Sequence, residues 1–204
     1  AYIFDLDGNQ LSKITASDGA ASDRFGYSVA VGSGRIVVGA NRDDSFQGSA
    51  YIFDLHGNQL AKITASDGAS GDTFGSSVSV GSGRVVVGSS FDDDDGSLSG
   101  SAYIFDLDGN QLAKITAADA AAGDEFGRSV AVGSGRIVVG AYFDDDNGLS
   151  SGSAYIFDLD GNQLAKITAS DGASGDQFGQ FVSVGSGRVV VGAYRDDDKG
   201  SDSG

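Results

Sequence analysis

The chain repeats one unit four times, and this repetition constrains its fold more than any other feature. Aligned on the letters AYIFDL, the units span residues 1–49, 50–101, 102–153 and 154–204, with no linker between them. A fixed period of this length is typical of architectures in which each unit buries its apolar faces against its neighbours. Residues 1–204 are therefore expected to form one propeller or half-propeller.

Each unit contains two hairpin patterns and no helical period. In the third unit, Ser101–Leu107 and Gln111–Ala117 flank an Asp-Gly turn, and Phe126–Gly133 and Arg136–Ala141 flank a Ser-Gly turn. Asp-Gly between runs of β-branched and aromatic residues is a strong hairpin signal. Four short antiparallel strands in each unit predict an all-β fold, a β-propeller of four-stranded blades. Continuous apolar runs such as RIVVGA predict strands that neighbouring blades cover on both faces.

The order of the strands predicts that the terminal blade is split between the two ends of the chain. The chain begins with the third and fourth strands of a blade and ends with the first and second strands of another. The halves could pair within one chain as a four-bladed monomer, or between two copies as an eight-bladed ring. Unpaired sheet edges invite association, and closed symmetry suits two identical halves. The homodimer, of about twice the 20.6 kDa chain mass, is favoured.

Composition narrows the possible partners. With 29 acidic and 13 basic residues, the net charge of −16 argues against nucleic-acid and membrane partners. No apolar run approaches the roughly 18 residues of a membrane span, and no signal peptide opens the sequence. Cys, Pro, Met and Trp are absent. Near-identical units and this reduced alphabet indicate a designed protein or a recent amplification, with design favoured. No location follows, although a natural version is expected outside the cell or at its surface.

The motifs FGxSV, GRIVVGA and GSAYIF resemble the FG-GAP repeats of integrin α-subunits and bacterial surface proteins, the bacterial form more closely. The FG pairs are Phe25-Gly26, Phe74-Gly75, Phe126-Gly127 and Phe178-Gly179. The resemblance covers all four units and implies a propeller, seven-bladed in integrins, which four units cannot make. Many integrin-type units carry a calcium loop between the FG and GAP strands. Here VGSGR, without a carboxylate, occupies that place, so this calcium site does not carry over.

Acidic loops supply the candidate metal ligands. They occupy residues 41–48, 91–100, 143–152 and 195–204, and the first loop is the shortest and poorest in ligands. Calcium takes six to eight oxygen ligands from flexible loops, so alternate aspartates could converge on one ion. The candidate ligands are Asp92, Asp94, Asp144, Asp146, Asp196 and Asp198. The alternative is a solvated loop that confers solubility. No cofactor is required by this interpretation.

Other polar motifs are interpreted as structural. DLDGN is expected to be a hairpin turn, and His56 a surface substitution within one such turn. Asp119 and Asp124 are expected to cap a turn and not to act as a catalytic pair, because an active site seldom recurs in every unit. The arginine after each Ser-Gly turn is expected to pair with surface aspartates. We identify no catalytic residue.

Two functions remain open. The first is a non-enzymatic scaffold that assembles with itself. The second is an adhesion module that binds a protein or glycan, in which at least one unit should have diverged on the binding face. The loops that begin at Asn41, Phe91, Phe143 and Arg195 do differ between units.

Overall fold

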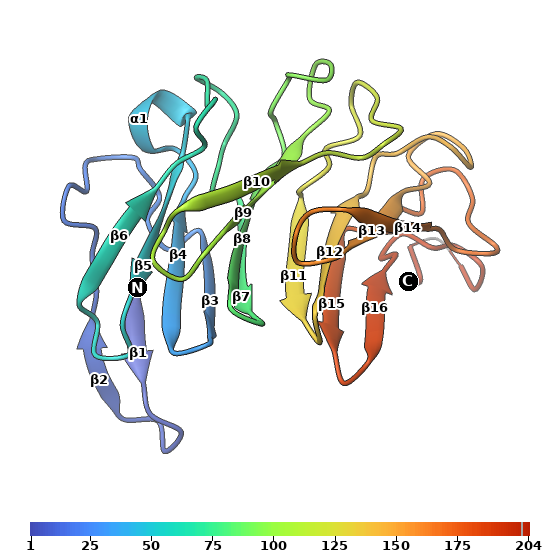
Figure 1. Cartoon of the computed structure of the whole chain (residues 1–204). Helices are drawn as coiled ribbons and strands as arrows, with labels where there is room; N and C mark the ends of the chain where they lie inside the picture. Colours follow the sequence, from blue (N-terminus) through green and yellow to red (C-terminus); the bar gives the residue numbers. More distant parts are fainter. Residues whose placement is uncertain (201) are drawn as a thin grey trace.

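Five antiparallel sheets stand side by side along an open arc in the computed structural model, which describes residues 1–200 and 202–204 (Figure 1). Three of them are four-stranded and form complete blades. Blade A contains β3 (Ser28–Gly32), β4 (Arg35–Ala40), β5 (Ser49–Phe53) and β6 (Gln59–Ile63). Blade B contains β7 (Ser77–Gly81), β8 (Arg84–Ser89), β9 (Ser101–Phe105) and β10 (Gln111–Ile115). Blade C contains β11 (Ser129–Gly133), β12 (Arg136–Ala141), β13 (Ser153–Phe157) and β14 (Gln163–Ile167).

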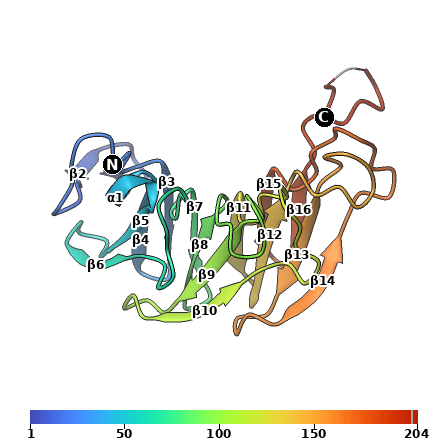
Figure 2. The ribbon, with the colours of Figure 1, turned by 90° about the horizontal axis from the view of Figure 1, so that it is seen from above.

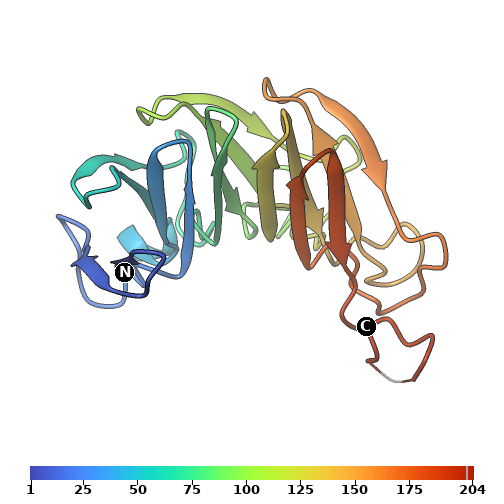
Figure 3. The same ribbon diagram turned by 90° about the horizontal axis from the view of Figure 1, so that it is seen from below.

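The other two sheets are two-stranded and lie at the ends of the arc. The N-terminal half-blade contains β1 (Tyr2–Phe4) and β2 (Gln10–Lys13), and the C-terminal half-blade contains β15 (Phe181–Gly185) and β16 (Arg188–Gly192). Each complete blade therefore takes two strands from one unit and two from the next, which confirms the predicted division of the terminal blade. Figures 2 and 3 show β3, β7, β11 and β15 along the concave side and β6, β10 and β14 along the convex side.

The single helix among the described residues is α1 (Asp43–Phe46), in the shortened acidic loop of the first unit. Its backbone is only partly helical, since Asp44 and Ser45 have positive φ. No described helix has the length and apolar character needed to cross a membrane.

The core consists of the interfaces between blades. Val37 and Ile52 of blade A share one buried cluster with Tyr103 and Phe105 of blade B. The ring of Phe74, from the FG motif, meets the rings of Tyr103 and Phe105 edge-to-face, with centroids 5.4 and 5.9 Å apart. Alternate residues of each strand thus face opposite neighbours, and the aromatic residues of AYIF pack between blades.

One glycine in each of the inner hairpins sets how closely the blades approach. A Cβ atom on Gly88 would lie 2.0 Å from the carbonyl oxygen of Gly127 in the next blade. The equivalent distances are 2.1 Å for Gly39 and 1.9 Å for Gly140. The innermost backbones are therefore nearly in contact, and only a residue without a side chain fits between them.

The two ends of the arc expose apolar faces that are buried elsewhere. Val31 on β3 is 72% exposed, whereas its equivalents Val80 and Val132 are 7% and 8% exposed. Val190 on β16 is 66% exposed, whereas Val37 and Val138 are fully buried. Each end of the arc is a blade interface that lacks its second side.

Candidate functional site

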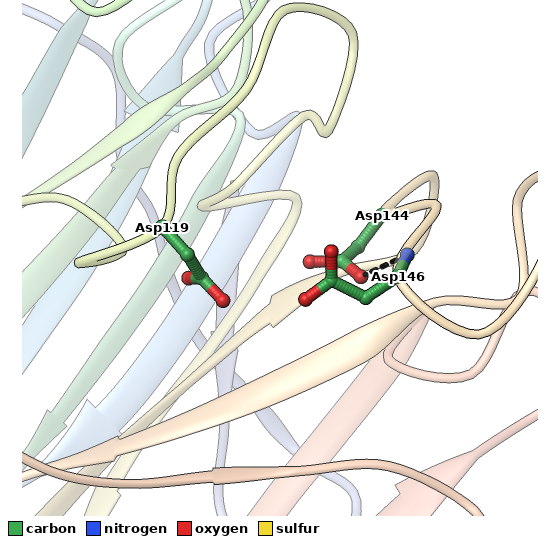
Figure 4. A group of neighbouring side chains, drawn as sticks. All are labelled: Asp119, Asp144 and Asp146. Atoms are coloured by element: carbon green, nitrogen blue, oxygen red, sulfur yellow. Dashed lines mark hydrogen bonds between the residues drawn. The ribbon is translucent and has the colours of Figure 1, made fainter.

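Two of the three predicted aspartate pairs lie in carboxylate clusters on one end of the blades. The loop after β12 brings Asp144 and Asp146 to Asp119, which lies in the loop between blades B and C (Figure 4). Carboxylate oxygens of the three residues lie within 4.8 Å of one another. Asp144 also accepts a hydrogen bond from the backbone N–H of Asp146 at 3.1 Å, which shapes the loop. This spacing suits a cation.

A lysine ammonium provides that positive charge. Lys166 on β14 places its Nζ atom 2.8 Å from carboxylate oxygens of both Asp119 and Asp144, and it also pairs with Asp146. The side chain of Asp144 is almost completely buried. Lys166 lies on the outermost strand of its blade, but most of its side chain is covered because it folds into the acidic cluster. Metal binding by these oxygens requires Lys166 to move away.

The same cluster recurs in the other two complete blades. Lys114 on β10 lies 2.9 Å from Asp67, 3.1 Å from Asp92 and 2.6 Å from Asp94. In blade A, Lys62 on β6 pairs with the aspartates Asp18, Asp43 and Asp44. The sequence carried a signal for this arrangement, since the lysine and the aspartates recur together in every unit. That signal did not reveal the fold that joins them.

A tyrosine completes each cluster from the middle of the blade. Tyr155 on β13 donates a hydrogen bond to Asp144 at 2.8 Å, and Lys166 lies over its ring at 5.2 Å from the centroid. Burial, together with the hydrogen bond to Asp144, holds the pKa of Tyr155 well above its usual range. Tyr155 therefore stays neutral and acts as a fixed donor to the carboxylate.

The clusters make stability depend on pH. Burial acts to raise the pKa of Asp144, but hydrogen bonds from Lys166 and Tyr155 outweigh it and lower the pKa overall. A carboxyl with a lowered pKa stabilises the fold above its unfolded pKa of about 3.9, and this contribution is lost as pH falls through the folded value. Acid unfolding should therefore include protonation of this cluster.

Replacing the lysine tests this account. Lys166→Met should lower the free energy of unfolding at pH 7 by roughly 1–3 kcal/mol, because it leaves a buried carboxylate without its partner. The loss should shrink at pH 3, because Asp144 of the variant, which no longer faces an ammonium, can then take up a proton. Urea unfolding at pH 7 and at pH 3 measures the loss at each pH. Lys199→Met, which replaces an exposed lysine, is the charge-matched control. Equal losses at pH 3 and pH 7 would contradict the pairing.

The third predicted pair, Asp196 and Asp198, lies beside the C-terminal half-blade. Among the described residues no lysine pairs with it. The carboxylates of Asp196 and Asp171 raise the pKa of Asp198 above its usual value. The lysine equivalent to Lys166 is Lys13 on β2, at the opposite end of the arc. The acidic half and the basic half of this fourth cluster are thus separated within the chain.

The apolar residues of the two half-blades are separated in the same way. Tyr2 and Phe4 on β1 are equivalent to buried tyrosines and phenylalanines in blades A to C, yet both are more than half exposed. An open groove beside them is lined by Ile3, Val29, Val31 and other apolar residues. It lies where β15 and β16 would stand if the N-terminal half-blade were completed.

One residue at the junction departs from the repeat. Ser28, Ser77 and Ser129 each donate a hydrogen bond to a glycine carbonyl of the next blade, at 2.8–2.9 Å. The fourth unit has Phe181 at this position, and its ring is exposed. A junction made by the C-terminal half-blade therefore gains apolar surface and lacks that hydrogen bond.

The remaining polar motifs are structural, as predicted. Asp5 of DLDGN accepts hydrogen bonds from the backbone of Asp7 and Asn9, which closes the hairpin turn. His56 is highly exposed in the equivalent turn of the second unit. Asp124 accepts a hydrogen bond from the backbone of Ala121 at 2.8 Å, so it caps a turn as predicted. Asp119, for which the same role was predicted, pairs with Lys166.

The arginines after the Ser-Gly turns connect neighbouring blades. Arg35 lies 3.7 Å from Asp108 and donates to the carbonyl of Leu107. Arg84 makes the equivalent contacts with Asp160 and Leu159. The predicted pairing with surface aspartates is confirmed for these two arginines.

The chain is similar to known proteins in sequence and in fold. The family model described as FG-GAP repeat matches residues 9–53, 58–105, 110–157 and 162–204. No curated protein sequence matches the chain. Among solved structures, the crystal structure of the computationally designed Ika4 protein is similar at 19% identity, with a TM-score of 0.57 and coverage of 91% of this chain and 92% of that one. At this identity the likeness concerns the fold alone.

Proposed function

Because this chain belongs to the FG-GAP repeat family, we propose that it is a non-enzymatic β-propeller scaffold that closes into an eight-bladed ring with a second copy. In that ring, each C-terminal half-blade pairs with the N-terminal half-blade of the other chain. Two complete blades arise in this way, and the ring has two-fold symmetry.

The separated fourth cluster is the observation that carries the proposal. By analogy with blades A to C, pairing β16 with β1 of a second copy would bring Lys13 to Asp171, Asp196 and Asp198. The three carboxylates would then pair with a lysine ammonium, as the carboxylates of every other cluster do. The partly exposed Phe178 would receive Phe4 in the edge-to-face contact that Phe126 makes with Phe157 at 5.9 Å. Charge and shape are complementary at the same junction.

The arc itself supports two copies over closure within one chain. β1–β2 and β15–β16 form separate sheets at opposite ends of the arc (Figure 3). Closure as a four-bladed monomer would require every blade interface to tilt further. The glycine contacts between inner strands leave little room for that, because their backbones are already nearly in contact.

The mass in solution tests the proposal. Multi-angle light scattering should give a mass of about twice 20.6 kDa at micromolar concentration. A tandem fusion of two copies should give this same mass without dimerising, because its own halves can close the ring. A stable monomer of the single chain would contradict the proposed ring.

We also propose that the acidic loops bind calcium. The positions of the lysines indicate which loop should bind it first. Ions at Asp92 and Asp94 or at Asp144 and Asp146 must displace a lysine, whereas Asp198 lies among carboxylates alone. We expect calcium to act first at the C-terminal half-blade, in competition with Lys13 of a second copy.

A melting experiment on the Val31→Asp variant, which is expected to be monomeric, tests this calcium proposal. Added calcium should raise Tm by roughly 2–4 °C, because an ion that binds only the folded state stabilises it. Chelator should reverse the change. Asp198→Asn should abolish it, with Asp202→Asn as the control for lost charge. An unchanged melting curve with calcium would remove calcium from the proposal.

A further inference from the structure

The four units differ from one another in a pattern that the scaffold does not require. Outside the acidic loops, only two positions carry a different residue in every unit. The first variable position is Arg24, Thr73, Glu125 and Gln177. The second variable position is Tyr27, Ser76, Arg128 and Gln180. Two positions at the start of the acidic loops also vary. The position of Asn41 has three residue types, and that of Arg42 is Arg in the first and fourth units and Phe in the second and third.

These positions lie close together although they are far apart in the chain. Residues 24 and 27 precede β3, and residues 41 and 42 follow β4, so the antiparallel pair brings them to one end of blade A. They meet their counterparts from blades B and C around a cavity of about 280 Å³. Nine of its eleven lining residues occupy the four positions, the other two being Phe46 and Gly71. Variation between units is thus concentrated on one concave surface.

The backbone at the first variable position is strained in every unit. Arg24 and Thr73 have φ of 59° and 60°, and Glu125 and Gln177 lie in the same left-handed region. Glycine would adopt this conformation freely, and a β-branched residue such as Thr73 is a clear outlier there. Four different side chains are retained at a conformational cost of about 1 kcal/mol each. This favours a role for the side chains over one for the turn.

Two residues that line the cavity also have buried polar atoms without partners. The Oδ1 atom of Asn41 and the Oγ1 atom of Thr73 have no hydrogen-bond partner among the described residues, and both side chains are more than nine-tenths buried. Eight such atoms occur among the described residues. Four of them belong to the variable positions, in Asn41, Thr73, Gln177 and Gln180. Polar atoms of this kind cost free energy unless a ligand or water satisfies them.

The charge of the cavity is opposite to that of the protein. Arg24, Arg42 and Arg128 line it, and none forms an ion pair within 4.0 Å in the described part of the chain. Glu125 accepts a hydrogen bond from Tyr142, and Arg128 attracts it without forming an ion pair within 4.0 Å. Three arginines without carboxylate partners are unexpected in a chain of net charge −16.

The arginines lie against aromatic rings. The guanidinium of Arg42 is 4.9 Å from the ring centroid of Phe46, and that of Arg24 is 6.0 Å from Tyr27. Stacking of this kind covers the faces of the guanidinium and leaves its N–H edge to bind an anionic group in bidentate fashion. Exposed faces of Phe91 and Phe46 add apolar contact area.

We propose that this variable-residue cavity binds a small hydroxylated anion, of the acidic-sugar or sugar-phosphate class. The arginines would bind the carboxylate or phosphate, and rotation of the Asn41 and Thr73 side chains would bring their buried oxygens to accept hydrogen bonds from ligand hydroxyls. The cavity lies within one chain, so its binding does not depend on ring closure. The propeller scaffold would thereby present a binding site whose residues differ between units.

Titration calorimetry at low salt, with chosen probes, tests the inference. Glucuronate or glucose 6-phosphate should bind with a Kd below about 1 mM, weakening as salt is added, and neutral glucose should bind at least tenfold more weakly. Whichever of the two anions binds more tightly identifies the source of the charge. Absence of binding by both anions at 10 mM would overturn the proposal, as would glucose binding equally well.

Substitutions taken from the other units separate binding from folding. Arg24→Thr and Arg128→Ser each introduce the residue that the second unit already holds at that position, so the fold tolerates them. Each should weaken anion binding at least tenfold, whereas Arg136→Ser, an exposed arginine at the opposite end of blade C, should not. Unchanged binding in both cavity variants would overturn the proposal.

An isosteric change tests the hydroxyl contacts. Thr73→Val removes the unpartnered oxygen and keeps the branched shape. It should weaken glucose 6-phosphate severalfold, leave the binding of inorganic phosphate unchanged, and raise Tm of the free protein. Equal effects on both phosphates would overturn the role of Thr73 as an acceptor for ligand hydroxyls.

Discussion

Val31→Asp should convert the protein from a species of about twice 20.6 kDa to the single chain. Val31 is 72% exposed within one chain, so the substitution should cost the isolated arc little. In the proposed ring it lies against β15 and β16 of the second copy, as Val80 and Val132 lie against their neighbours. A buried, unpaired carboxylate there should raise the dissociation constant at least 100-fold, because the two-fold ring contains the junction twice.

A control substitution at a leucine shows whether loss of the dimer depends on the position of the new charge or on the charge itself. Leu149 is also 72% exposed, but it lies on the acidic loop of the third unit and not on a strand of either half-blade or on β3. Leu149→Asp adds the same charge and should leave the mass unchanged. Sedimentation velocity at several concentrations measures both variants. A dimer that survives Val31→Asp would show that the half-blades do not form the interface.

Gly88→Ala should be among the most destabilising additions of a single methyl group to the chain. The new Cβ would lie 2.0 Å from the backbone carbonyl of Gly127 and 2.3 Å from the hydroxyl oxygen of Ser77. Neither blade can yield without breaking its own strand pairing. The free energy of unfolding should fall by about 3–5 kcal/mol, a large share of the total for a domain of this size. Urea unfolding followed by circular dichroism measures this change.

The repeat supplies the control. Gly192 is equivalent to Gly88, but its nearest neighbours from an added Cβ are 3.8 Å away, because no blade follows it in the chain. In the monomeric Val31→Asp background, Gly192→Ala should change stability by less than about 1 kcal/mol. In the otherwise unchanged protein it should weaken the dimer, since the second copy would approach as blade B approaches blade A. Equal destabilisation at the two glycines would contradict this account.

Much of the fold was predictable because each unit repeats the same local signals. The Asp-Gly and Ser-Gly turns mark both hairpins, and the alternation within AYIF separates the two faces of a strand. The division of the terminal blade followed from strand order alone. The fold remains the same whether the ring closes within one chain or between two, so sequence order does not separate those alternatives.

The candidate sites were less predictable because their residues meet only after the blades pack. The sequence predicted Asp144 and Asp146 as candidate ligands, but nothing in it joined them to the lysine of the same cluster. Lys166 and Asp119 are 47 positions apart. A contact between successive units of this kind depends on where one sheet lies against the next. The variable positions were visible in the aligned units, but their cavity was not.

By itself, the sequence determined the repeat, the hairpins, the strand order and the excess of acidic residues, since these follow from spacing and local propensity. Only the tertiary structure decided that lysines fill the acidic clusters and that the two half-blades carry complementary parts of a fourth cluster. Only the packing of blades A to C gathers Arg24, Arg42 and Arg128 at one cavity. The physical reason is that charge and burial depend on distances between units, which are set by how closely the inner glycines let the blades approach.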